Sequence, residues 1–312
     1  MKSTAALGLL YLFLMVLLAR PAVKATRSNR ASIIYSSQWL SLDVDRNYML
    51  WACNDIYNLF LGQYTNAEYY YDHVENFHAQ TTWALMKSKI IHCENYHTFA
   101  TVLYIGHGGA LYSGGVALYY SIFEQATHNN PNNPPQAIYD YNIYYAPTAG
   151  THRFVFLWAC RQGNEAGYYR TMLGPFGMAY CWTRQPELSK DGYGDPDIPG
   201  DPDTRPYCFI GFEQASPRLS EPVKESTSTL YKHWLVFFYY YALNGYTIKN
   251  ALREAGRTAG YQEGWLDTPL RNGFWTYFPP EFLPPDVPPS PDNKYWGRMR
   301  IYGNANINLL WG

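Results

Sequence analysis

The sequence lacks several features that mark common classes of protein. The net charge is only −1 and there is no basic block, which argues against a nucleic-acid-binding protein, because such a protein needs a cationic face. There is no G-x-S-x-G elbow and no P-loop, so a serine α/β-hydrolase and an NTPase are disfavoured. Neither HExxH nor C-x-x-C occurs, and no internal repeat is present. These absences remove several enzyme and binding classes without naming another.

What the chain does contain is typical of a globular protein. It has 312 residues, of which 47% are apolar, enough for one large domain or two small ones. It also contains 31 Tyr and 10 Trp, which raise the aromatic content to 18%. Rings with polar groups suit a packed α/β core or an extracellular surface, but they indicate no activity.

The first 25 residues have the layout of a secretory signal peptide. Lys2 supplies a short positive region, and residues 5–19 are uniformly apolar. Val23 and Ala25, a β-branched and a small residue, stand at the −3 and −1 positions of the expected cut after Ala25. Removing this segment leaves 21 basic and 25 acidic groups, a net charge of −4. The alternative is an uncleaved signal anchor, although 15 apolar residues are few for a spanning helix. No later stretch is long and apolar enough to span, so we expect a secreted or extracytoplasmic protein without a stable membrane span.

The rest of the chain alternates short apolar runs with segments of helical periodicity, which predicts an α/β fold. We expect one domain over residues 26–312, a three-layer α/β/α arrangement around a mostly parallel central sheet. The expected strands are residues 31–37, 67–74, 98–106, 153–159, 177–182, 207–212 and 298–310. The expected helices are residues 45–61, 81–93, 223–243 and 248–255. Residues 128–135 are predicted as loop, and residues 278–294 as a Pro-rich strap before the last strand.

Two reactive residues follow predicted strands. His107 lies in the segment VLYIGHGG, directly after the first apolar run. Cys160 lies in the segment VFLWACRQG, directly after the next one, 53 residues later. If both strands are central and parallel, imidazole and thiol stand at the same edge of the sheet, where ligands bind in such folds. A His–Cys pair within hydrogen-bond distance favours the thiolate, which is the nucleophile. The other interpretation is a buried structural thiol beside an ordinary turn histidine, but the matched contexts favour the reactive pair.

This pattern resembles the caspase-like cysteine peptidases, which include caspases, legumains, gingipains, clostripain and separase. It is nearest to the gingipain-type and CHAT-domain members, which place His-Gly after one hydrophobic strand and Ala-Cys after the next, about 50 residues later. The caspase form Q-A-C-[RQG]-G is not kept, because Trp158 stands in place of Gln and Gly163 comes one residue late. Residues 237–255 and 299–309 are similar to the helix–Gly–helix segment and the closing strand of these domains.

The resemblance implies a cysteine endopeptidase that hydrolyses protein or peptide substrates through an acyl-enzyme and needs no metal for its chemistry. Cys160 would attack the scissile carbonyl, and His107 would transfer the proton to the leaving amine. The N–H groups of Gly108 and Cys160 would bind the oxyanion. The alternative is a catalytically inactive caspase-like fold that serves as a surface binding or structural protein.

Two further segments contain groups that bind metals. The acidic loop over residues 191–203 could collect oxygen ligands for a structural calcium ion, although its spacing is not that of an EF-hand. The alternatives are a solvated acidic loop and a rim that attracts basic substrates. The segment 73–97 holds zinc-competent side chains, for which scattered surface histidines are the expected explanation. They are His73, His78, His92, Cys93 and His97.

The chain has five cysteines, an odd number. If Cys160 is the nucleophile it must stay a free thiol, and four remain. In an exported protein these can pair, and the least contorted pairing is Cys53 with Cys93 and Cys181 with Cys208. The other possibility is that all four are buried thiols.

Overall fold

The computed structural model describes residues 29–38, 45–78, 80–113, 116–125, 135–146, 150–164, 177–183, 206–223, 228–260, 273–277 and 290–311. The predicted signal peptide, the acidic loop at 191–203 and most of the predicted Pro-rich strap lie outside these ranges. So do residues 128–134 of the predicted loop.

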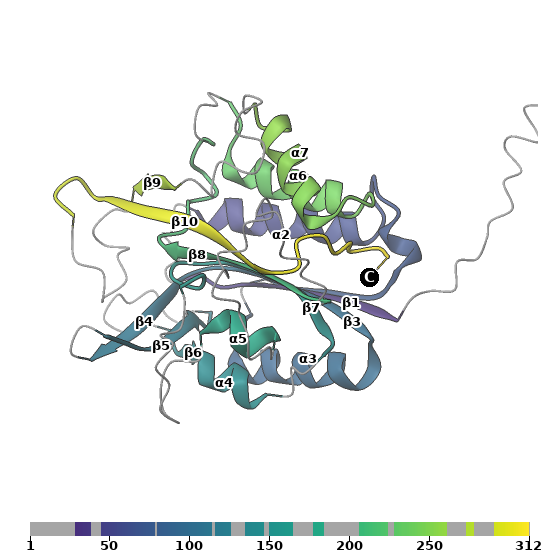
Figure 1. Cartoon of the computed structure of the whole chain (residues 1–312), viewed down its shortest axis with the longest axis horizontal. Coiled ribbons are helices and arrows are strands. Elements are labelled where there is room, and N and C mark those ends of the chain that lie inside the picture. The colour runs from purple at the N-terminus through teal and green to yellow at the C-terminus, as the bar shows by residue number, and fades with distance from the viewer. Residues whose placement is uncertain are drawn as a thin grey trace, which may run out of the picture.

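A seven-stranded, mostly parallel sheet forms the centre of the fold, in the order β2-β1-β3-β7-β8-β10-β9 (Figure 1). Strands β2, β1, β3, β7 and β8 are parallel, whereas β10 runs antiparallel to both β8 and β9. The strands are β1 (Arg30–Ser36), β2 (Tyr71–Phe77), β3 (Phe99–Ile105), β7 (His152–Trp158), β8 (Cys208–Gln214), β9 (Phe274–Tyr277) and β10 (Lys294–Gly303). The predicted α/β class with a mostly parallel sheet is confirmed.

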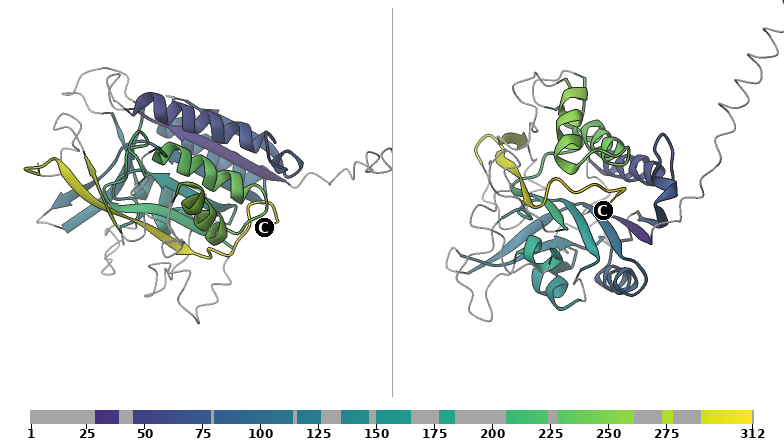
Figure 2. Two further views of the ribbon diagram at one scale, coloured as in Figure 1. Left: turned by 90° about the horizontal axis from the view of Figure 1, so that it is seen from above. Right: turned by 45° about the vertical axis from the view of Figure 1, so that its right-hand side comes forward.

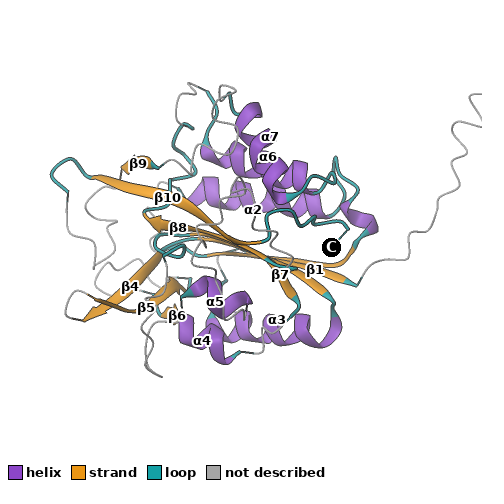
Figure 3. Ribbon diagram, viewed as in Figure 1, coloured by secondary structure: helices purple, strands orange, loops and turns teal. Residues whose placement is uncertain are grey.

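Helices cover both faces of this sheet, which gives the three layers that the sequence predicts (Figures 1 and 3). One face carries α2 (Arg46–Phe60), α6 (Tyr231–Ala242) and α7 (Ile248–Thr258), which are seen from above in Figure 2. The other carries α3 (Trp83–Tyr96), α4 (Asp140–Tyr145) and α5 (Met178–Thr183). No helix within the described ranges is long and apolar enough to cross a bilayer.

The side chains of the central strands alternate between these two faces. Along β3, Leu103 packs with the α2–α6–α7 side, whereas Val102 and Tyr104 pack with the α3–α4–α5 side. A strand that is buried on both faces reads as a continuous apolar run, which is why β3 and β7 could be recognised from sequence. The helices begin as their sequences indicate: Thr82 and Thr247 cap α3 and α7 by accepting N–H bonds at 3.2 and 3.3 Å.

Two expectations about secondary structure are wrong. Residues 177–182 were expected as a strand, but Met178–Thr183 is helix α5, whose buried Met178 and Trp182 pack under the sheet. A short apolar run fits a buried helical turn as well as a strand, and tertiary packing selects between them. The sequence also did not predict a second sheet after His107, built from β4 (Gly108–Ser113), β5 (Val116–Phe123) and β6 (Ala137–Tyr139).

Smaller differences concern the ends of the elements. The predicted strand at 67–74 is a 3-10 turn, Ala67–Tyr69, followed by β2. The long helix predicted from residue 223 begins only at Tyr231. The last strand starts at Lys294, so it takes in the end of the predicted Pro-rich strap.

The proposed disulfides are not formed, because all five cysteines are free thiols. Cys53 packs on the α2–α6–α7 face and Cys93 on the opposite face, so the central sheet lies between them. The same separation holds for Cys208 and Cys181. The second interpretation, four buried thiols that form no disulfide, is therefore correct.

Candidate active site

His107 lies in a tight turn between the end of β3 and the start of β4. Its carbonyl accepts the Phe123 N–H at 3.2 Å and the Tyr104 hydroxyl at 3.1 Å. The buried Tyr104 hydroxyl also contacts Ser37 Oγ and the Phe123 carbonyl. This buried cluster holds the backbone of the histidine against both sheets.

The two glycines beside His107 are required by close packing. A Cβ on Gly106 would lie 2.5 Å from Ser37 Oγ and 2.6 Å from the Tyr104 hydroxyl oxygen. A Cβ on Gly108 would lie 2.4 Å from the Cys160 carbonyl oxygen. All three distances are far below ordinary contact. Glycine at 106 therefore allows the turn to pack on Ser37 and Tyr104, and glycine at 108 allows it to approach the cysteine loop.

Cys160 begins a loop that leaves β7 and folds back over β8. Arg161 has a φ of +66°, a left-handed conformation that turns the chain, and its N–H donates to the Gln214 carbonyl at 2.7 Å. The Gly163 N–H donates to the Phe212 carbonyl at 2.9 Å. The loop is thereby held by the backbone of the neighbouring strand.

The side chain of Gln162 fixes the position of Cys160 from the other side. It is 1% exposed, and its amide nitrogen donates to the Cys160 carbonyl at 2.6 Å and to the Ser121 carbonyl at 2.9 Å. Since Ser121 belongs to β5, Gln162 ties the cysteine loop to the sheet that follows His107.

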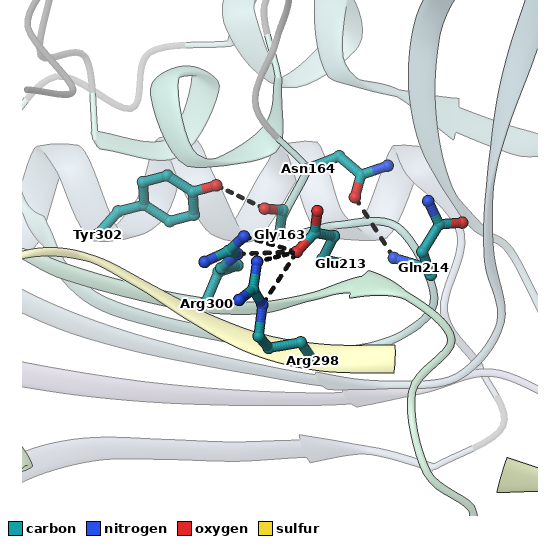
Figure 4. A network of polar contacts seen from close by, with 7 residues as sticks. All are labelled: Gly163, Asn164, Glu213, Gln214, Arg298, Arg300 and Tyr302. Carbon is teal, nitrogen blue, oxygen red and sulfur yellow. Dashed lines mark hydrogen bonds and ion pairs between the residues drawn. The ribbon is translucent and has the colours of Figure 1, made fainter. Parts of the chain in front are cut away.

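A polar network on β8 and β10 supports the loop from behind (Figure 4). Glu213 Oε2 accepts from Arg298 Nε at 3.2 Å and from Arg300 Nε at 2.9 Å. The Tyr302 hydroxyl donates to the Gly163 carbonyl, and Asn164 Oδ1 accepts the Gln214 N–H at 3.4 Å. The last strand of the chain therefore contributes to the position of the cysteine loop.

The sulfur of Cys160 faces Ser216, which follows β8. The Ser216 N–H donates to Sγ at 3.4 Å, and Ser216 Oγ lies 3.6 Å from the same sulfur. These two contacts tie the sulfur to the segment after β8. Cys160 is 8% exposed, so its thiol lies at the bottom of the site rather than on the surface.

His107 and Cys160 line one pocket of about 40 Å³ at the carboxyl edge of the sheet. Strands β3 and β7 are adjacent and parallel, with Ile105 opposite Trp158, so the residues that follow them meet at this edge, as the sequence predicts. Four segments complete the wall: the start of α2, the end of β3, the end of β7 and the segment after β8. The other lining residues are Asp45, Met49, Ile105, Gly106, Trp158, Ser216, Pro217 and Arg218.

The acidic group in this pocket is already engaged in the fold. Asp45 accepts the N–H groups of Leu219 and Ser220 at 2.7 and 2.9 Å, and the Ser220 hydroxyl at 2.6 Å. The carboxylate thus holds the segment after β8 against the start of α2. Trp158 adds a second tie, because its indole N–H donates to the Pro217 carbonyl at 2.8 Å.

The backbone N–H of Gly108 points away from the second sheet. Phe123 bonds the His107 carbonyl, and the next pair along the β4–β5 ladder is Gly108 with Ile122. Alternate pairs in an antiparallel ladder do not exchange hydrogen bonds, so the Gly108 N–H is directed away from β5. Gly108 also packs against the backbone carbonyl of Cys160.

Sequence reasoning missed Ser216 and Gln162. Ser216 was detectable in principle, because it follows the predicted strand at 207–212 and reaches the same edge as His107 and Cys160. Gln162 gave no signal, since its role depends on the second sheet that the sequence did not predict.

Of the zinc-competent side chains in the segment 73–97, the structure brings three histidines together and separates the other two. His73, His92 and His97 converge at the opposite edge of the sheet. Cys93 is buried beneath the sheet, and His78 lies beyond the far end of β2. The expectation of scattered histidines is wrong for those three.

Comparison with models of known protein families finds no match, and comparison with curated proteins finds none either.

Proposed function

We propose that this protein is a cysteine endopeptidase with Cys160 as nucleophile and His107 as general acid and base. The observation that carries the proposal is that both side chains line one pocket at the carboxyl edge of adjacent parallel strands. Three separate constraints hold them there: the Tyr104 cluster, the Gln162 side chain and the glycine contacts. A histidine and a thiol in a pre-organised pocket are the components of nucleophilic acyl transfer.

The reaction follows from the roles of these groups. The Cys160 thiolate attacks the carbonyl carbon of the scissile peptide, and the carbonyl oxygen becomes an oxyanion near the Gly108 and Cys160 amides. When the C–N bond breaks, His107 gives its proton to the leaving amine. Water, deprotonated by His107, then attacks the thioester and releases the acid product, which regenerates the free thiol.

The resemblance to caspase-like peptidases is part of the proposal. Its support is the position of His-Gly and Ala-Cys after two adjacent central strands of a three-layer α/β/α fold. The extra residue before Gly163 has a use in this chain, because Gln162 clamps the cysteine loop to β5. The departure from the caspase pattern is therefore compatible with a working site.

Export is the second part of the proposal. It rests on the charged, apolar and small-residue layout of residues 1–25. N-terminal sequencing of protein recovered from the medium or envelope should give Thr26 as the first residue. A full-length chain extracted with the membrane would favour the signal anchor.

The decisive experiment compares Cys160→Ala and His107→Ala with the parent protein on a library of fluorogenic peptides. Each variant should lose hydrolysis, because catalytic groups that act as a unit fail singly. Cys181→Ala is the matched control, since this buried thiol lies away from the pocket and should leave hydrolysis unchanged. Hydrolysis retained by Cys160→Ala would overturn the proposal. Peptide binding without turnover by the parent would instead favour an inactive fold used for binding.

A further inference from the structure

Three histidines gather near the amino ends of the parallel strands, whereas the candidate active site lies beyond their carboxyl ends. His73 is the third residue of β2, His92 lies near the end of α3, and His97 is the residue that follows α3. His73 pairs with Ala31, the second residue of β1, so it is level with the amino ends of the parallel strands. His107 and Cys160 lie beyond the carboxyl ends, so the two sites are separate.

The three imidazole rings are close enough to share one ion. One ring nitrogen from each histidine lies within 4.8 Å of the other two. The ring centroids are 4.8 Å apart for His73 and His92, and 5.3 Å apart for each of the other pairs. Three histidines from a strand, a helix and a loop thus converge on one point.

One nitrogen pair in this cluster has the spacing of two ligands in a metal site. Nε2 of His92 and Nε2 of His97 are 3.4 Å apart. That distance is long for a hydrogen bond between two ring nitrogens, since N–H···O bonds in proteins span about 2.7–3.2 Å. Two ligands about 2.05 Å from a tetrahedral zinc ion are separated by about 3.3 Å. A cation between these nitrogens would also remove the need for one imidazole to donate to the other.

Carboxylates stand behind the histidines, as they do around bound zinc. Asp72 Oδ1 lies 3.4 Å from Nδ1 of His97, on the other side of the ring from the Nε2 that faces His92. A histidine that binds a metal through one nitrogen usually donates its other N–H to a carboxylate, which fixes the ring. Glu75 Oε2 lies 3.2 Å from Nε2 of His73, and its other oxygen pairs with Lys89 at 2.6 Å.

We propose that His73, His92 and His97 bind a divalent transition-metal ion of the zinc class, with Asp72 orienting His97. Three imidazoles suit this class of ion, and a fourth position remains for water or a further ligand. Because β2 is the edge strand of the sheet, the ion would cross-link that strand to the end of α3. The site is structural and does not take part in the proposed hydrolysis.

Zinc titration of the full chain, produced without an affinity tag and stripped with a chelator, tests the proposal. Calorimetry should give one zinc ion per chain, and cobalt should give the visible absorption bands of a low-coordinate site. His92→Gln should weaken zinc binding at least 100-fold, and Asp72→Asn by about 10-fold or more. His78→Gln is the matched control, since His78 lies on the same segment outside the cluster, and its affinity should be unchanged.

Several results would overturn the proposal: no binding, binding that His92→Gln leaves intact, or equal loss in His78→Gln. Circular dichroism of each variant identifies any loss of binding that comes from misfolding, and Asp72→Asn supplies the test if His92→Gln does not fold. Cys160→Ala should bind zinc as the parent does. Failure of the zinc site and failure of the peptidase proposal are therefore distinguishable.

Discussion

Replacing Gly108 with Ala is the sharpest test of how the histidine turn meets the cysteine loop. The added Cβ would lie 2.4 Å from the Cys160 carbonyl oxygen and 2.5 Å from Gln162 Nε2, where ordinary contact begins at 3.4 Å. Gln162 can move, but the Cys160 carbonyl is backbone. The turn and the loop must therefore separate by about 1 Å, a misplacement that can cost about 100-fold in rate. A 100-fold loss corresponds to about 2.7 kcal/mol of transition-state stabilisation.

The assay is kcat/KM on the best peptide substrate, together with the free energy of unfolding from urea denaturation. We expect kcat/KM to fall about 100-fold and the free energy of unfolding to fall by about 1–3 kcal/mol, the usual cost of overpacking. Adding Gln162→Ala to Gly108→Ala should not restore activity, because the clash with the backbone remains. Leu111→Ala is the control, since this residue of β4 is 47% exposed and should change little. Gly108→Ala with activity within threefold of the parent would refute this account of the site.

Three further predictions concern the core, the thiols and the response to pH. Phe238→Ala should lower the free energy of unfolding by about 3–5 kcal/mol in urea denaturation, because this fully buried ring packs on Phe154 and Phe156. An unchanged free energy of unfolding would contradict this packing. Mass spectrometry after alkylation of the unreduced, denatured chain should count five free thiols. In the native chain Cys53 and Cys93 should stay unlabelled, because burial raises the pKa of each thiol to about 12. Burial, with Lys232 nearby, lowers the pKa of His233 below its ordinary 6.5, so the folded state disfavours the protonated ring. The free energy of unfolding should therefore decrease as the pH falls below about 6.5, and less so in His233→Gln; equal pH profiles would show that the ring does not contribute.

The sequence by itself was enough to predict the layers and to place His107 and Cys160 at one edge of the sheet. The apolar runs at 98–106 and 153–159 are rich in β-branched and aromatic residues, which favours buried strands of a parallel sheet, and helical periodicity marks the segments between them. His107 and Cys160 could be paired because parallel strands deliver the residues after them to one edge. These predictions needed only the hydrophobic pattern of each segment and the parallel direction of neighbouring strands.

Tertiary structure decided what depends on contacts between distant segments. Whether residues 178–183 form a strand or a helix is settled by the face on which Trp182 is buried. The sheet lies between Cys53 and Cys93, and their spacing along the chain does not reveal this. Gln162, Ser216 and the three converging histidines acquire their roles from strands and loops far away in sequence. Their positions depend on how the elements pack, which a local pattern does not contain.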